Sequence, residues 1–196
     1  NLKKRFENKN LDESYFDKKV NQANEQLSFL SKTIDDFKEF YTISKEKEIF
    51  SVKDAILNAT TILSADLKSH NIDLETSFET FDEVKIFGVK SELSQILIAI
   101  ISNSIDVLKN IKNPEIQIDI FSSSAEVIIK LADNGGGIKA KNLKKIFEPY
   151  FSTKEEGTGI GLYLAKMIIE ESFGGKILVE NKKEGVLFSL FIEKAL

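Results

Sequence analysis

Two glycine-rich stretches decide how this sequence folds: DNGGGI at residues 133–138 and GTGIGL at residues 157–162. Together they hold six of the chain's ten glycines. Glycine weakens helices and strands, but it permits positive φ and lets the main chain approach a ligand closely. The second stretch opens an apolar segment with helical spacing, and the free N–H groups of a helix N-terminus favour anions. We therefore expect a polyanion to be held by main-chain N–H groups.

An asparagine within an apolar helix precedes the first stretch. A helix is predicted from a Ser91 cap to the region before Pro114, with an apolar face at helical spacing: Leu93, Ile96, Leu97, Ile100, Ile101, Ile105 and Leu108. Asn103 shares a face with Gln95 and Ala99, because the three are four residues apart. An amide oxygen here suits a hard cation such as Mg²⁺, which keeps water and phosphate ligands. An asparagine that hydrogen-bonds within the core is the alternative.

The remaining pattern predicts an α+β domain. A helix runs from a Ser51 cap to about Leu67, and another runs from Thr158 to Phe173 before Gly174 and Gly175. Strand-like segments occupy residues 72–78, 84–88, 115–122, 125–133, 176–180 and 185–192, and the last four form two hairpins. Because strands and helices do not alternate strictly, we expect one mixed sheet with helices on one face.

A mostly polar segment, residues 139–157, is predicted to be a mobile loop. It contains FEPYFSTK at residues 147–154, where Phe147, Tyr150 and Phe151 are apolar anchors. We expect a flap that docks over a ligand, with Lys154 reaching a phosphate oxygen. The alternative is a loop that packs on the domain while Lys154 stays solvated. The carboxylate of Asp133 could accept a hydrogen bond from the exocyclic amine of a base. The alternative is an ordinary Asx turn before the glycines.

The N-terminal region predicts a long helix, because residues 11–47 contain neither Gly nor Pro. Its apolar residues recur at alternating spacings of three and four, which is a heptad seam: Val20, Ala23, Leu27, Leu30, Ile34, Phe37 and Tyr41. Such a seam packs either on the chain's own domain or on a partner chain, and its three heptads favour the partner.

The composition of the chain argues against several classes of partner and binding site. The net charge of −4 weighs against nucleic acid as a partner, and the lack of cysteine excludes disulfides and thiolate metal sites. No uninterrupted apolar run reaches the roughly 18 residues of a membrane span, and no signal-peptide pattern begins the sequence. We therefore expect a chain that is not embedded in a membrane.

In this order the motifs resemble the ATP-binding domain of sensor histidine kinases, in the superfamily shared with gyrase, mismatch-repair ATPases and heat-shock chaperones. QILIAIISNSIDVL (95–108) resembles the N box, DNGGGI the G1 box, FEPYFSTK the F box and GTGIGL the G2 box. The resemblance covers about residues 50–193, and residues 27–41 resemble the end of a dimerisation helix. It implies a two-layer α/β sandwich at residues 49–196, preceded at residues 1–48 by the second dimerisation helix of a homodimer.

The resemblance also implies the site. Asn103 would ligate Mg²⁺, Asp133 would accept a hydrogen bond from the adenine amino group, and residues 139–156 would form the ATP lid. The expected contacts to ATP are Asn103, Asp106, Asp133, Gly135, Gly137, Ile138, Tyr150, Lys154, Gly157, Thr158, Gly159, Ile160, Gly161 and Leu162.

The resemblance implies a protein histidine kinase that passes phosphate to an Asp on a response regulator. Gyrase-type relatives carry a general-base Glu where this chain has Ala99, which takes no proton, so rapid ATP hydrolysis is disfavoured. The chain's one histidine, His70, is expected to be a surface turn residue, so the acceptor is expected before Asn1. The expected location is the cytoplasm, alone or as part of a membrane-anchored sensor. An anti-sigma-type protein-serine kinase and a non-catalytic nucleotide-binding dimer module are the alternatives.

Overall fold

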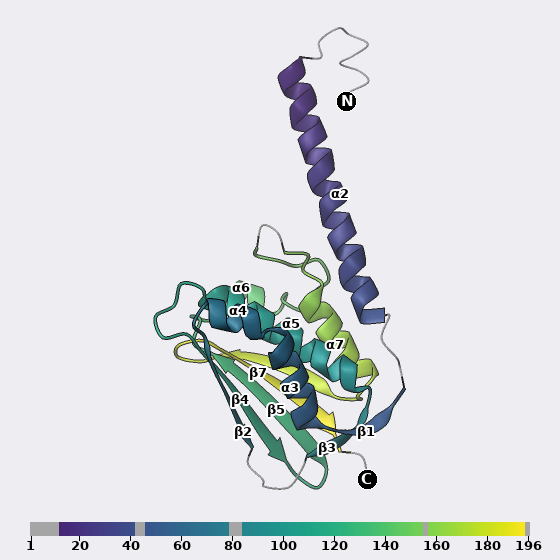
Figure 1. Ribbon diagram of the computed structural model, residues 1–196, viewed down its shortest axis with the longest axis vertical. Helices are drawn as coiled ribbons and strands as arrows, with labels where there is room; N and C mark the ends of the chain where they lie inside the picture. Colours follow the sequence, from purple (N-terminus) through teal and green to yellow (C-terminus); the bar gives the residue numbers. More distant parts are fainter. Residues whose placement is uncertain (1–11, 42–45, 79–83, 155–156, 195–196) are drawn as a thin grey trace.

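The computed structural model describes residues 12–41, 46–78, 84–154 and 157–194, with the side chains of residues 29, 30 and 32–41 outside the description. Helix α2 (Glu13–Tyr41) projects away from a domain with two layers, one a sheet and one made of helices (Figure 1). The predicted long N-terminal helix and the two-layer α+β class are confirmed.

The main sheet has five strands in the order β2-β4-β5-β7-β6. Their bounds are β2 (Asp73–Phe78), β4 (Glu115–Ser122), β5 (Glu126–Asp133), β6 (Lys176–Asn181) and β7 (Val186–Glu193). Strand β2 runs parallel to β4, and the other pairs are antiparallel, so the predicted mixed sheet and both predicted hairpins are confirmed. Alternate residues of the central hairpin are buried, which gives the sheet one covered face: Ile116, Ile118, Ile120, Val127, Ile129 and Leu131.

Helices cover that face of the sheet (Figure 1): α3 (Val52–Ile62), α4 (Ser64–Ser69), α5 (Lys90–Leu108), α6 (Ala140–Leu143) and α7 (Gly161–Glu171). Every residue of the predicted apolar face of α5 is buried. Among the described residues, α5 alone has the length and composition of a membrane span, but 56% of that stretch is buried inside the domain. Helix α5 is therefore the core helix of this domain.

A small second sheet was not predicted. Strand β1 (Glu48–Ser51) pairs antiparallel with β3 (Lys85–Gly88). Strand β1 has only four residues, which are too few to show a clear period-2 alternation of apolar and polar side chains. This ribbon joins the region after α2 to the domain.

Of the two predicted serine caps, Ser51 does occupy the N-cap position of α3, whereas Ser91 lies inside α5 and is not its N-cap. Ser51 precedes α3 but makes no capping hydrogen bond with its side chain, and the N–H of Val52 donates to the Val84 carbonyl instead. Helix α5 starts at Lys90, one residue before Ser91, and its first turn is closed by hydrogen bonds to the Val89 carbonyl.

Two predicted helix bounds also change. The helix expected up to about Leu67 is broken at Leu63 (φ −88°, ψ 3°) into α3 and α4. The last helix begins at Gly161 rather than Thr158, because Gly159 lies at φ +67° and cannot belong to a right-handed helix.

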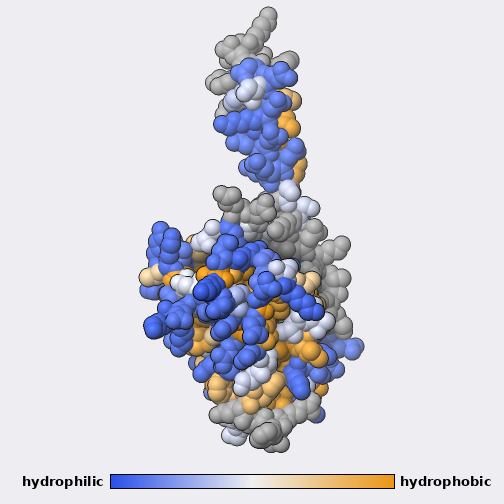
Figure 2. Space-filling view, turned by 60° about the vertical axis from the view of Figure 1, so that its left-hand side comes forward, coloured by the Kyte–Doolittle hydropathy of each residue, from blue (hydrophilic) through white to orange (hydrophobic). Residues whose placement is uncertain are grey.

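The heptad residues that the structure describes are exposed on α2. Val20 and Leu27 keep 37% and 64% of their surface accessible. Phe16, which is not part of the predicted seam, keeps 47%, and Figure 2 shows hydrophobic atoms along one edge of this helix. The side chains of Leu30, Ile34, Phe37 and Tyr41 lie outside the described part. These exposed residues form an apolar edge that the described part of the chain leaves uncovered.

Candidate functional site

Asn103 lies on α5 with its amide held at a fixed angle. Its Nδ2 donates to the Ala99 carbonyl at 2.8 Å, one turn earlier, so Oδ1 is the end left for a further partner. The predicted shared face of these two residues is thereby confirmed. Ala99 also faces α7, since a Cβ placed on Gly161 would lie 3.7 Å from the Ala99 Cβ.

A lysine of the flap reaches this asparagine. The Nζ of Lys154 donates to Asn103 Oδ1 at 2.8 Å and to Asp106 Oδ2 at 2.6 Å. Lys109 binds the other carboxylate oxygen, Asp106 Oδ1, at 2.6 Å. Burial alone would raise the pKa of Asp106, but hydrogen bonds and the charges of Lys109 and Lys154 outweigh it and lower that pKa. The structure thus brings together three predicted site residues. Lys109 is an exposed neighbour that pairs with Asp106 from outside the predicted site, and this pairing was not predicted.

Asp133 ends β5, as predicted, and both of its carboxylate oxygens have partners. Ser104 Oγ donates to Oδ2 at 3.0 Å, and the N–H of Gly135 donates to Oδ1 at 2.9 Å. Ser104 is on α5 beside Asn103 and is nearly fully buried. The sequence analysis missed Ser104, although it follows Asn103 directly and a buried hydroxyl needs a partner.

The first glycine stretch makes a turn that only glycine adopts easily, since Gly136 and Gly137 have φ of +92° and +84°. Ile138, which follows, is held at its main chain. Asn181 Oδ1 accepts from its N–H at 2.8 Å, and Asn181 Nδ2 donates to its carbonyl at 2.7 Å. Asn181 ends β6, 43 residues away, so no local signal in the sequence could have revealed this clamp.

The second glycine stretch, residues 157–162, connects the flap to α7 and packs against the flap. The Tyr150 N–H donates to the Gly159 carbonyl at 3.1 Å, and a Cβ on Gly159 would lie 2.5 Å from the carbonyl carbon of Tyr150. Thr158 is buried. The Ile160 side chain is also buried, so the expected ligand contact of this residue falls to its main chain. Leu162 is partly buried against the core, and Gly157 donates its N–H to the Lys154 carbonyl.

The flap differs from its prediction in two respects. Phe147 and Phe151 pack against the core as expected, but Tyr150 is 63% exposed with φ +66°, so it is not an anchor. The segment predicted as a plain loop contains α6 and buries Ile146. Residues 155 and 156 of the predicted lid lie outside the described part.

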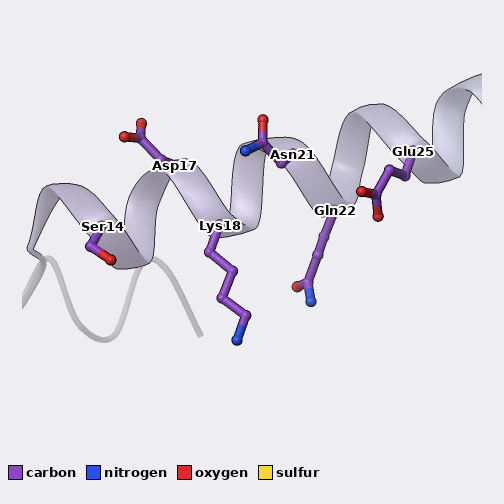
Figure 3. Close-up of a pocket in the computed structure, with 6 residues that line it drawn as sticks. All are labelled: Ser14, Asp17, Lys18, Asn21, Gln22 and Glu25. Atoms are coloured by element: carbon purple, nitrogen blue, oxygen red, sulfur yellow. The ribbon is translucent and has the colours of Figure 1, made fainter.

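Two other places carry no comparable site. His70 caps the C-terminal end of α4, where its Nδ1 lies 2.8 Å from the Asp66 carbonyl oxygen, so the predicted turn position is confirmed. A hollow along α2 is lined by polar residues whose side chains diverge in Figure 3, where Asp17 and Asn21 point away from Lys18 and Gln22. Groups that diverge in this way do not converge on one ligand.

The donor atoms beside Asn103 fit a hard cation. The ammonium of Lys154 already occupies a position between an amide oxygen and a carboxylate oxygen, which are ligands that Mg²⁺ prefers. Among the described residues, no group of three or more His, Cys, Asp or Glu side chains is placed to hold a metal. Mg²⁺ is usually bound by one or two protein oxygens and takes its remaining ligands from water and substrate phosphate.

Comparisons with known proteins agree with this geometry. Residues 88–196 match the family described as histidine kinase-, DNA gyrase B-, and HSP90-like ATPase. Sporulation kinase C of Bacillus subtilis is 29% identical over 141 residues, which are 72% of this chain and 32% of that protein. The sensor histidine kinase ZraS of Salmonella typhimurium is 32% identical over 145 residues, 72% of this chain and 30% of that protein.

A solved structure, the catalytic domain of the histidine kinase ThkA, has a TM-score of 0.69 and 29% identity to this chain. The match covers 76% of this chain and 96% of that domain. By contrast, the chain spans 32% or less of the two full-length relatives named above. The chain belongs to the histidine kinase-, DNA gyrase B-, and HSP90-like ATPase family, and it carries a nucleotide-binding catalytic domain of the sensor histidine kinase type.

Proposed function

We propose that this chain binds ATP with Mg²⁺ and is the catalytic portion of a sensor histidine kinase. In this proposal the γ-phosphate passes to a histidine outside the chain and then to an aspartate of a response regulator. One observation supports it most: α5 brings Asn103, Asp106 and Ser104 against Lys154 of the flap and Asp133 of the sheet. These groups come from the expected motifs and converge on a single helix.

Asp133 would select the base. Ser104 and Gly135 fix its carboxylate, yet each carboxylate oxygen keeps a second lone pair. A fixed acceptor at this point suits the exocyclic amine of adenine. Gly135, Gly137 and Ile138 would line the base and ribose, with Asn181 keeping the main chain of Ile138 in place.

The phosphates would lie toward α7. Gly157, Thr158, Gly159 and Gly161 would surround them with main chain, and Asn103 with Asp106 would hold Mg²⁺ directly or through its waters. Bound Mg²⁺ would neutralise charge on the transferring phosphoryl group. Transfer then depends on orienting the γ-phosphate toward an imidazole nitrogen. Ala99 provides no general base, so water is not activated at this position.

The acceptor and the partners are further parts of the proposal. His70 is bonded to the end of α4, which supports a capping role rather than an acceptor role. The exposed apolar edge of α2 supports a dimer formed through residues 1–48, with residues 49–196 as the catalytic domain. The relative ThkA has been crystallised with the response regulator TrrA, which supports a partner of that class. We also propose a cytoplasmic location, alone or within a membrane-anchored sensor.

Phosphotransfer tests this proposal. The chain and a longer product that includes the coding sequence upstream of Asn1 are incubated separately with γ-labelled ATP. We expect acid-labile label on the longer product and none on the chain itself. Label that appears on the chain and disappears in His70→Gln would contradict the assignment of the acceptor. Acid-stable label on serine would instead favour the protein-serine kinase.

A further inference from the structure

We propose that Lys154 is an internal stand-in for Mg²⁺: it occupies the cation position on Asn103 in the free protein and leaves it when the metal arrives with nucleotide. The inference rests on the proposed function and extends it to the regulation of the same site. It concerns the described residues on either side of the contact, Asn103 and Asp106 on α5 and Lys154 on the flap.

The contact joins segments far apart in the sequence. Lys154 is 51 residues from Asn103 and 48 from Asp106, yet its Nζ lies 2.8 Å and 2.6 Å from their oxygens. The ammonium therefore bridges one neutral and one anionic oxygen. A hard divalent cation requires the same oxygen donors, so Lys154 and Mg²⁺ compete for Asn103 Oδ1.

The flap is shaped to present this lysine. Lys154 donates its N–H to Ser152 Oγ at 3.0 Å, Ser152 Oγ donates to the Lys154 carbonyl at 3.2 Å, and Gly157 donates its N–H to that carbonyl at 3.3 Å. Ser152 and Gly157 thereby hold the main chain of Lys154 in place. Moving the ammonium off α5 would release the only side-chain link that the described residues show between this turn and Asn103.

Lys109 supplies an internal comparison. It binds the same Asp106 carboxylate at 2.6 Å, but from the C-terminal end of α5, and the hydrogen bonds described for it lead to Asp106 and not to Asn103. The side chains of Lys109 and Lys154 are 45% and 41% exposed. The two lysines thus match in charge, partner and exposure, and they differ in whether they occupy the cation position and tether the flap.

The binding test compares Lys154→Met with Lys109→Met. Affinity for a fluorescent non-hydrolysable ATP analogue is measured for each protein with Mg²⁺ and with EDTA, and the ratio of the two gives the metal coupling. In Lys154→Met, no ammonium competes with Mg²⁺ for Asn103, so binding with Mg²⁺ becomes stronger relative to the wild type. In EDTA, the variant also lacks the ammonium that takes the place of Mg²⁺, so binding without metal becomes weaker. Both effects raise the ratio, by about fivefold for an ion pair of this exposure. Lys109→Met should leave the ratio within about twofold of the wild type.

A wild-type ratio in Lys154→Met, or the same rise in both variants, would overturn the competition while leaving the proposed nucleotide site intact. Absence of saturable binding in every protein, wild type included, would instead overturn the proposed function and this inference with it.

A second readout needs neither metal nor nucleotide. Amide hydrogen exchange of residues 147–154 is measured in the free proteins. Lys154→Met removes the tether and should accelerate exchange there by about fivefold. Asp106→Asn is an independent variant that removes only the ion pair and keeps the bond to Asn103, so it should accelerate exchange by a smaller factor. Lys109→Met should not. Unchanged exchange in both tether variants would contradict the proposed link between flap and helix.

Discussion

Gly159→Ala is the most informative single substitution in the second glycine stretch. Gly159 lies at φ +67°, where a Cβ costs about 1–2 kcal/mol. That Cβ would also lie 2.5 Å from the carbonyl carbon and 2.6 Å from the N of the next residue, at the Tyr150–Phe151 peptide. Such overpacking costs a further 1–3 kcal/mol or so. We therefore expect a loss of about 2–5 kcal/mol in the free energy of unfolding, or local opening of the flap.

Gly174→Ala is the matched control. Gly174 has a similar φ of +62°, but no atom lies within 4 Å of the position of its Cβ. It should therefore lose only the backbone contribution of about 1–2 kcal/mol. Urea unfolding gives the stability of each variant, and calorimetric titration with a non-hydrolysable ATP analogue gives its affinity. Gly159→Ala should lower both quantities, and Gly174→Ala should lower stability alone. Equal losses of stability in the two variants, with unchanged affinity, would refute the packing described around Gly159.

Three further predictions concern the hydrogen bonds of the site. Ser104→Ala should weaken nucleotide affinity by about twofold to tenfold in the same titration, because Asp133 loses one of two orienting donors; an unchanged affinity would count against that role. Asn181→Ala should accelerate amide exchange at Ile138, because both main-chain bonds of that residue are lost; a protected amide would show that the clamp is dispensable. The pKa of Asp106 is lowered in the folded state, so its ion pairs stabilise the fold above the ordinary pKa of 3.8, and this contribution is lost as pH falls through the lower folded-state pKa. Asp106→Asn should therefore make the free energy of unfolding depend less on pH at the acid end, by less than about 1 kcal/mol. An identical pH dependence in the variant and the wild type would contradict the ion pairs.

The sequence predicted those parts of the fold that repeat with a regular period. The apolar face of α5 and the alternation in the β4–β5 hairpin follow from burial on one side of an element, and both are visible without a structure. Helix beginnings were predicted less well. Ser51 occupies the N-cap position of α3 without a side-chain capping bond, and the first turn of α5 is closed by the Val89 carbonyl one residue earlier than expected, so a serine near a helix start does not by itself fix the cap.

The residues of the site, like the elements of the fold, were predicted only in part. The order of the motifs, with the family resemblance that they carry, selected Asn103, Asp133 and Lys154, and the structure places each of them on or against α5. The supporting contacts of Asn181 and Lys109 were missed because they depend on side-chain direction and, for Asn181, on pairing across 43 residues. Tyr150 was assigned wrongly because an aromatic residue in a polar loop looks like an anchor, whereas its positive φ turns it outward.

Isothermal titration with a non-hydrolysable ATP analogue, with and without Mg²⁺, tests the nucleotide site most directly. The wild-type chain should bind with one-site saturation that Mg²⁺ strengthens, and Asn103→Ala should keep its circular dichroism spectrum while losing the effect of Mg²⁺. No binding heat from the folded wild type, or an undiminished Mg²⁺ effect in Asn103→Ala, would contradict the site.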